Sequence, residues 1–205
     1  MSELLQSFTT GIVALPPFGV GALLVLLLYA LQSEIRFGAK ARSHAAGVSD
    51  RGSTLAVSLA SAVPVAGFVL AMKGRMPVVL PGMPIVAWVG VGLGALGLVL
   101  RLWAVLMLRE RYTRTLLLQE GHSIERGGPY RFVRHPGYLG SLLCLNGIAL
   151  ASGNLLVLLA SIAATFAAYA YRVQVEDAML VVAFGAPYEA YRRDTGALLP
   201  FRMRT

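Results

Sequence analysis

The sequence predicts an all-α integral membrane protein of about five transmembrane helices, the last two of which form a C-terminal helical hairpin. Hydrophobic residues make up 57% of its 205 residues and charged residues only 14%, whereas soluble domains carry about 25% charged residues. Polar segments or tight turns separate its apolar runs, and a helix of about 20 apolar residues crosses the hydrocarbon core. A chain of this length predicts one structural domain.

The first two helices are expected over residues 12–31 and 54–72. Pro16 and Pro17 fall in the first turns of the first helix, where proline is tolerated. Pro64 lies in the middle of the second helix and predicts a kink there, because proline removes one backbone hydrogen bond.

The third helix is expected over residues 84–108, and glycines form a narrow side on it. Small residues at this spacing allow close helix contact, which suits internal packing and dimer contacts equally. Arg101 lies about two turns before the end of this helix. Its side chain can extend to the lipid headgroups or face the protein interior, and we expect the first. The glycines are Gly90, Gly92, Gly94 and Gly97.

Two further helices are expected over residues 136–151 and 154–171, separated only by Ser152 and Gly153. So tight a turn predicts a hairpin whose second helix returns the chain to the starting side. Both apolar runs are slightly short for a full span, so we expect the helix ends to extend into polar sequence. The tail over residues 172–205 is polar and basic.

The distribution of positive charge predicts the orientation of the chain. Residues 36–51, 109–135 and 172–205 carry four, six and five Lys or Arg residues, and five spans place all three segments on one side. The opposite side carries only Lys73 and Arg75. This asymmetry predicts an outer N-terminus, cytoplasmic polar segments and a cytoplasmic C-terminus. Orientation and anionic lipids also account for the net charge of +8, so no nucleic-acid partner is expected.

Neither disulfide nor metal chemistry is expected. The single cysteine, Cys144, lies in an apolar run, and three His without cysteine partners do not have the spacing of a structural zinc site. Residues 1–10 contain Glu3 and no Lys or Arg, unlike the basic start of a signal peptide. The first apolar run is therefore expected to remain as a membrane helix.

The stretch from Gly127 to Tyr138 concentrates polar chemistry between two apolar regions. Pro136 disfavours helical geometry at His135, so His135 is expected on a bend just before a helix. The free N–H groups and positive dipole end of that helix would face the bend, which suits an anionic ligand group. A basic loop whose arginines only set membrane orientation is the alternative interpretation.

A second polar stretch directly follows the hairpin. Arg172 and Glu176 are four residues apart, so they share one helix face, and Asp177 adds a second acid. A simple ion pair at the membrane boundary is the alternative interpretation of this spacing.

Taken together, these stretches resemble the isoprenylcysteine carboxyl methyltransferase family, within a wider group that includes membrane phospholipid N-methyltransferases. The resemblance covers residues 119–201 and divides the domain into three N-terminal helices at 1–108 and a catalytic region at 109–205. The N-terminal helices match only as generic membrane helices. The matching pattern is His122-x-Ile124, Gly128-x-Tyr130, Arg134-His135-Pro136-x-Tyr138, Arg172-x-x-x-Glu176-Asp177-x-x-Leu180, Phe184-Gly185-x-x-Tyr188-x-x-Tyr191 and Leu199-Pro200-Phe201.

The resemblance implies an S-adenosylmethionine-dependent methyltransferase with its cofactor pocket on the cytoplasmic face. Arg172 would face the methyl acceptor, and Arg172 and Glu176 would be the catalytic residues. The chain departs from the family at Glu125, where an apolar residue is common, and at Asp177, where a second Glu is common. The implied cofactor contacts are His122, Ser123, Ile124, Glu125, Tyr130, His135, Pro136, Gly137, Tyr138 and Glu176.

The chemistry of the side chains agrees with these roles. Tyr130 and Tyr138 can present π faces to the sulfonium or the adenine of the cofactor. Arg134 and the helix start at Pro136 can meet its carboxylate. Glu176 can accept hydrogen bonds from its ammonium group or from a ribose hydroxyl.

The methyl acceptor is expected to be lipophilic and to enter from the membrane. A carboxylate is already ionised at neutral pH and needs only orientation, for example by Arg172. A phospholipid amine is the alternative acceptor, and it must lose a proton to Glu176, Asp177 or His135. A sterol-type membrane reductase with a nicotinamide cofactor and a non-enzymatic membrane protein are further alternatives.

Overall fold

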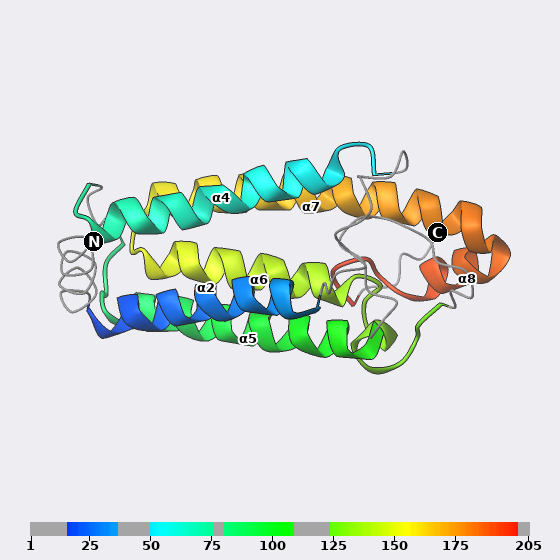
Figure 1. Cartoon of the computed structure of the whole chain (residues 1–205), viewed down its shortest axis with the longest axis horizontal. Coiled ribbons are helices and arrows are strands. Elements are labelled where there is room, and N and C mark those ends of the chain that lie inside the picture. The colour runs from blue at the N-terminus through cyan, green and yellow to red at the C-terminus, as the bar shows by residue number, and fades with distance from the viewer. Residues whose placement is uncertain (1–15, 37–49, 76–79, 109–123, 201–205) are drawn as a thin grey trace.

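The structure is a computed structural model and describes residues 16–36, 50–75, 80–108 and 124–200. Within these ranges the regular elements are helices, and the only extended pairing is an isolated bridge between Val133 and Gly196. In chain order the elements are α2 (Pro17–Arg36), α4 (Ser53–Met72), α5 (Ile85–Leu108), the 3₁₀ helix η2 (Gly128–Arg131), α6 (Pro136–Ala151), α7 (Leu155–Phe184) and α8 (Ala186–Asp194) (Figure 1).

In the part of the chain that the structure describes, five long helices lie along a common axis, which confirms the predicted all-α membrane fold (Figure 1). Among the described residues, α4, α5 and α7 are long and apolar enough to cross a membrane, and α2 and α6 are shorter apolar helices. The outer surface of the bundle exposes large apolar side chains such as Leu59, Leu156 and Phe166. An apolar exterior of this kind suits contact with lipid.

Helix α6 is the centre of the bundle and contacts α2, α4, α5 and α7. Its most extensive contact is with α5, because glycines on both helices let the two backbones meet. A Cβ added at Gly90 would lie 2.5 Å from the backbone nitrogen of Ala151, and one at Gly140 would lie 2.6 Å from the carbonyl oxygen of Gly97. The narrow side of α5 is therefore used inside the molecule, whereas Gly92 is exposed.

Two helices run further than their apolar sequence. Helix α2 ends at Arg36 rather than at residue 31, and α7 continues to Phe184 rather than ending at residue 171. No glycine or proline interrupts α7 before Gly185, whose φ of 58° ends the helix. The extension of α7 confirms the expectation for the second hairpin helix and places Arg172, Glu176 and Asp177 on it. The first hairpin helix does not extend, because α6 keeps the bounds of its apolar run, Pro136–Ala151.

The expectation that Arg101 extends to the lipid headgroups was wrong. Its side chain is buried: Nε donates to Gln32 Oε1 at 3.1 Å, and Nη1 donates to Ser141 Oγ at 2.7 Å. The guanidinium also lies 5.1 Å from the centre of the Tyr29 ring. Polar acceptors on α2 and α6 thus satisfy the charge within the bundle, so it need not reach the headgroups.

Replacing Gly90 by alanine is expected to destabilise the protein by about 1–3 kcal/mol, because the added methyl meets backbone atoms of α6. The measurement is the midpoint of thermal unfolding of the detergent-solubilised protein. The same substitution at Gly92 is the matched control, since a Cβ there meets nothing within 4 Å. Equal midpoints for the two variants would contradict this packing of α5 on α6.

Candidate functional site

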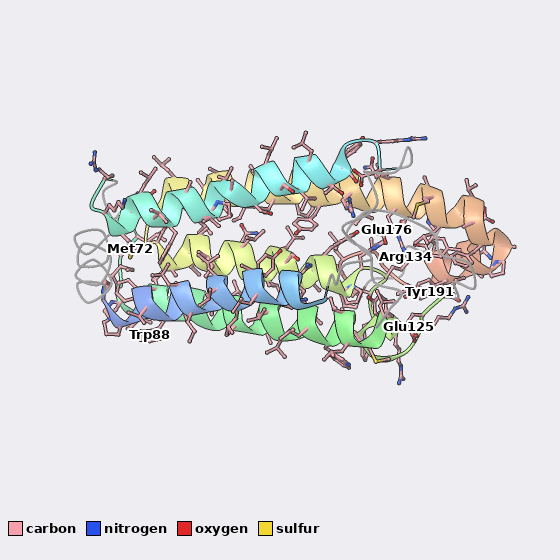
Figure 2. The ribbon with its side chains drawn as sticks, viewed as in Figure 1. Met72, Trp88, Glu125, Arg134, Glu176 and Tyr191 are labelled. Carbon is pink, nitrogen blue, oxygen red and sulfur yellow. The ribbon has the colours of Figure 1, made fainter. Side chains whose placement is uncertain are left out.

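The described parts of the three basic segments meet at one end of the bundle (Figure 1). Figure 2 shows Glu125, Arg134 and Glu176 at this end, and Met72 at the opposite end. The polar stretch before α6 and the polar part of α7, which the sequence places far apart, are therefore neighbours.

The bend predicted before α6 is present. His135 has φ −122° and ψ 60°, and Pro136 is the first residue of the helix. The backbone N–H of Arg134 donates to the carbonyl of Gly196 at 2.8 Å, and that of His135 donates to Ala197 at 3.0 Å. The C-terminal tail thus holds the bend from outside the hairpin.

The His135 ring is buried between the two acids of α7. Its Nε2 lies 2.9 Å from Asp177 Oδ1 and its Nδ1 lies 3.4 Å from Glu176 Oε2. The ring also stacks on Tyr138, with 5.4 Å between the centroids. Burial alone would lower the pKa of His135, but the Glu176 charge and the Asp177 hydrogen bond raise this pKa to about 9. His135 is therefore a cation at neutral pH and a poor proton acceptor.

Asp177 lies within a cluster of paired charges, and both of its oxygens have partners. We call this set the charged cluster: Asp50, Arg134, His135, Arg172, Glu176 and Asp177. Its Oδ1 contacts His135 and accepts a hydrogen bond from the Tyr188 hydroxyl at 2.5 Å. Its Oδ2 accepts a hydrogen bond from Arg134 Nη2 at 3.0 Å. Arg134 also donates to two backbone carbonyls at the C-terminal end of α8. Burial and the Asp177 charge raise the pKa of Tyr188, so Tyr188 keeps its proton and continues to donate.

Glu176 has an oxygen that can receive a ligand. Its side chain is 22% exposed, and its buried Oε2 forms an ion pair with His135 Nδ1 at 3.4 Å. This oxygen accepts no hydrogen bond of good geometry from the residues that the structure describes. A buried polar atom without a hydrogen bond is costly. An ammonium group or a sugar hydroxyl, both present in the cofactor that the resemblance implies, would supply the missing donor. The arrangement therefore fits that cofactor.

Arg172 is held by a residue that the sequence reasoning missed. Its Nη1 lies 2.7 Å from Asp50 Oδ1 and also donates to the hydroxyls of Ser53 and Thr54. Its Nε donates to the Tyr138 hydroxyl at 3.0 Å. An acid followed by Ser and Thr directly before an apolar run is a helix-capping pattern, and this pattern was the sequence signal for Asp50.

The other predicted site residues occupy the surroundings of the cluster. The Glu125 carboxylate accepts hydrogen bonds from its own loop, including the backbone N–H of Gly127 at 2.8 Å. The Tyr130 hydroxyl donates to the carbonyl of Ala104 on α5 at 3.3 Å. Pro136 and Gly137 are buried at the start of α6, and Ile124 is half-buried. Their predicted cofactor contacts remain predictions, and His122 and Ser123 lie outside the described residues.

An open groove of about 350 Å³ adjoins the cluster at Arg134. Apart from Arg134, its lining belongs to α8 and the tail, so it is a neighbour of the buried cluster rather than its interior. The remaining lining residues are Glu189, Arg192, Arg193, Thr195, Gly196 and Ala197.

The sequence of this chain is similar to sequences of known membrane methyltransferases. The family model described as phospholipid methyltransferase matches residues 85–187, half of the chain. The probable protein-S-isoprenylcysteine O-methyltransferase of Oryza sativa subsp. indica is 30% identical over 118 residues, which is 57% of this chain and 62% of that protein. The protein-S-isoprenylcysteine O-methyltransferase of Tribolium castaneum is 28% identical over 126 residues, or 59% and 45% of the two chains. The matches thus span less than two thirds of these relatives.

The fold is similar to that of a solved protein, the eukaryotic intramembrane Ras methyltransferase isoprenylcysteine carboxyl methyltransferase. The TM-score is 0.61 at 24% identity, over 71% of this chain and 52% of that one. The stretch matched by the family model contains α5, α6 and α7, and with them His135 and Glu176. Asp50 lies outside that stretch.

His135 is expected to titrate near pH 9 rather than near 6.5. Because the pKa of His135 is higher in the folded than in the unfolded state, protonation of His135 stabilises the folded protein. This contribution to the free energy of unfolding is fully present below about pH 6.5 and is lost as the pH rises through about 9. The shift corresponds to roughly 3 kcal/mol. The measurement is the pH titration of imidazole resonances in ¹⁵N-histidine-labelled protein, with His135→Gln identifying the signal. A midpoint near 6.5 would contradict the placement of the ring between two carboxylates.

Proposed function

We propose a function for this chain from the premise that it belongs to the phospholipid methyltransferase family. It is an integral-membrane, S-adenosylmethionine-dependent methyltransferase that resembles protein-S-isoprenylcysteine carboxyl O-methyltransferases and methylates a lipophilic carboxylate. The observation that carries this proposal is the buried Glu176 oxygen beside the Tyr138 ring, which pairs with His135 at 3.4 Å but accepts no hydrogen bond of good geometry from the described residues.

The described residues fit the cofactor group by group. When bound, S-adenosylmethionine supplies an electrophilic methyl group for in-line displacement. Glu176 accepts a hydrogen bond from its ammonium group or a ribose hydroxyl, and Tyr138 offers an aromatic ring to the sulfonium or adenine. The N-terminal end of α6 at Pro136 favours its carboxylate. The buried side chains beside them, those of His135, Arg172 and Asp177, limit access of water to the reacting atoms.

The charged cluster favours an acceptor that needs no base. His135 is already protonated at neutral pH, and both oxygens of Asp177 are occupied. The Glu176 oxygen that pairs with His135 but accepts no hydrogen bond is assigned to the cofactor. A carboxylate acceptor releases no proton on methylation, and it needs only to be oriented toward the methyl group, a role that we assign to Arg172.

A phospholipid amine is the second candidate acceptor, favoured by the description of the matched family. An amine must lose a proton before or during methyl transfer, and Glu176 would then have to serve as the base. The same side chain would have to leave the cofactor or bind it through one oxygen only. The reductase alternative has no counterpart among the relatives named above.

The proposed orientation places the site on the cytoplasmic face, with the N-terminus outside and the C-terminus inside. Support comes from the position of the described basic segments at one end of the bundle. Met72, the last residue of α4 and the residue before Lys73, lies at the other end (Figure 2). The acceptor enters from the lipid, because the site lies at the end of helices whose outer faces are apolar.

Replacing Glu176 by glutamine is expected to weaken S-adenosylmethionine binding by about tenfold or more, because a charge-assisted hydrogen bond is lost while the side-chain volume stays the same. The measurement is titration calorimetry of the detergent-purified protein, with a reduced dinucleotide as the control ligand. Glu189→Gln, an exposed acid on α8, is the matched control and should bind as wild type does. Unchanged affinity in the Glu176 variant would remove Glu176 from the cofactor site.

Methyl transfer to an S-prenylated cysteine with a free carboxylate is expected, and none to its carboxamide, because the amide has no ionised oxygen. The measurement is the release of S-adenosylhomocysteine with each compound in the same detergent micelles. Phosphatidylethanolamine is the third arm of this experiment. Turnover of phosphatidylethanolamine alone would replace the carboxylate by the amine acceptor, and binding of the dinucleotide alone would replace the methyltransferase by a reductase.

A further inference from the structure

We infer that Asp50 is a positioning residue of the candidate site. Its carboxylate holds the Arg172 guanidinium, and through it the Tyr138 hydroxyl, at the place where the methyl acceptor binds. This inference rests on the proposed function and deepens it. It brings the N-terminal part of the chain into the site, because Asp50 lies outside residues 85–187 matched by the family model.

The start of α4 fixes the Asp50 carboxylate independently of Arg172. Asp50 is 1% exposed. Its Oδ1 accepts hydrogen bonds from the hydroxyls of Ser53 and Thr54, each at 2.9 Å. Its Oδ2 accepts the backbone N–H of Thr54 at 3.1 Å, which caps the first turn of the helix. The carboxylate is therefore a rigid anchor rather than a mobile counter-ion.

This anchor defines the plane of the Arg172 guanidinium. Nη1 contacts Asp50 Oδ1 at 2.7 Å, Ser53 Oγ at 2.9 Å and Thr54 Oγ1 at 2.7 Å. On the other side, Nε donates to the Tyr138 hydroxyl at 3.0 Å. Asp50 before α4, two hydroxyls in the first turn of α4 and the Tyr138 hydroxyl on α6 thus set both the position and the tilt of the group.

A series of contacts connects Arg172 to the proposed cofactor site. The Tyr138 hydroxyl interacts with the Glu176 carboxylate, and Glu176 in turn faces His135 at 3.4 Å. A displacement of Arg172 would therefore reach the acceptor side first and the cofactor side only through Tyr138. This order predicts a larger effect on acceptor kinetics than on cofactor affinity.

The Asp50–Arg172 ion pair is not the only contact that holds α4 against α7. The two helices pack along their length, and the Tyr171 hydroxyl donates to the carbonyl of Arg51 at 2.8 Å beside the pair. Buried ion pairs contribute little net stability compared with apolar packing. Orientation of Arg172 is the property that Asp50 adds.

The negative charge of Asp50 supports its assignment as a positioning residue. Burial would raise the pKa of Asp50, but the backbone N–H of Thr54, the hydroxyls of Ser53 and Thr54 and the charge of Arg172 hold this pKa below its usual value. Asp50 is therefore ionised wherever the protein is folded at neutral pH.

The test is Asp50→Asn, which retains a side-chain oxygen that caps α4 but removes the charge that holds Arg172. The matched control is Asn154→Ala, which removes the capping contact of Asn154 Oδ1 with the N–H of Val157 at 3.1 Å, at the opposite end of the bundle. Ser53→Ala is a second variant that keeps the Asp50 charge and removes one acceptor of Nη1.

Three measurements are made on the detergent-purified full chain. The first is the Arg172 Nε–H resonance in ¹⁵N-arginine-labelled protein, identified by its absence in Arg172→Lys. The second is the Kd of S-adenosylmethionine. The third is kcat and KM for the S-prenylated cysteine carboxylate.

In Asp50→Asn we expect a shifted or broadened resonance and a kcat/KM for the acceptor about tenfold or more below wild type, with the cofactor Kd within about threefold. Ser53→Ala should change the resonance and kcat/KM in the same direction by less. Asn154→Ala should leave both unchanged.

An unchanged resonance in Asp50→Asn would overturn the hold of Asp50 on Arg172. A shifted resonance with wild-type kcat/KM, or an equal kinetic loss in Asn154→Ala, would overturn its role in positioning. Wild-type protein that methylates no acceptor would instead defeat the proposed function, and the resonance would still decide whether Asp50 holds Arg172.

Discussion

Two consecutive acids on one membrane helix, Glu176 and Asp177, impose the constraint on which the end of the bundle depends. A buried carboxylate must be paired or hydrogen-bonded. Asp177 meets this requirement through His135 before α6, Arg134 in the same loop and Tyr188 on α8. The pairing of charge therefore joins the loop, the hairpin and the C-terminal helix, in addition to the backbone hydrogen bonds of Arg134 and His135 to the tail.

The close approach of α5 and α6 gives that charged cluster a rigid base. The glycine contacts between the two helices leave no room for sliding, because backbone meets backbone. From the same face of α5, Arg101 donates to Ser141 Oγ and, at 3.4 Å, to the carbonyl of Gly137. The first turn of α6, and with it the position of His135, is thus fixed from the membrane side as well as by the tail.

Local sequence patterns predicted the fold. The partners of the buried charged side chains, by contrast, depend on contacts between residues far apart in the sequence. The helix at 136–151 was predicted with its observed bounds, because Pro136 and the turn after Ala151 are local signals. The environment of Arg101 depends on Gln32, which lies 69 residues away, and no local pattern indicates that partner. The pairing of Arg172 with a residue 122 positions earlier is equally invisible to periodicity or spacing. Glu176 and His135 were predicted as site residues from local motifs, whereas their mutual contact follows only from the fold.

The charges of the cluster bear on which acceptor it accommodates. In the described residues, each basic group of the cluster lies beside an acid, so the cluster is close to neutral before any ligand binds. A cofactor with one net positive charge and an anionic acceptor together leave that balance unchanged. The headgroup of phosphatidylethanolamine carries an ammonium and a phosphate, so it is neutral and would leave the charge of the cofactor uncompensated. Uncompensated charge is costly where water is scarce. The balance therefore favours a carboxylate, and Asp50 completes it by neutralising Arg172. The pairs are Arg134–Asp177, His135–Glu176, His135–Asp177 and Arg172–Asp50.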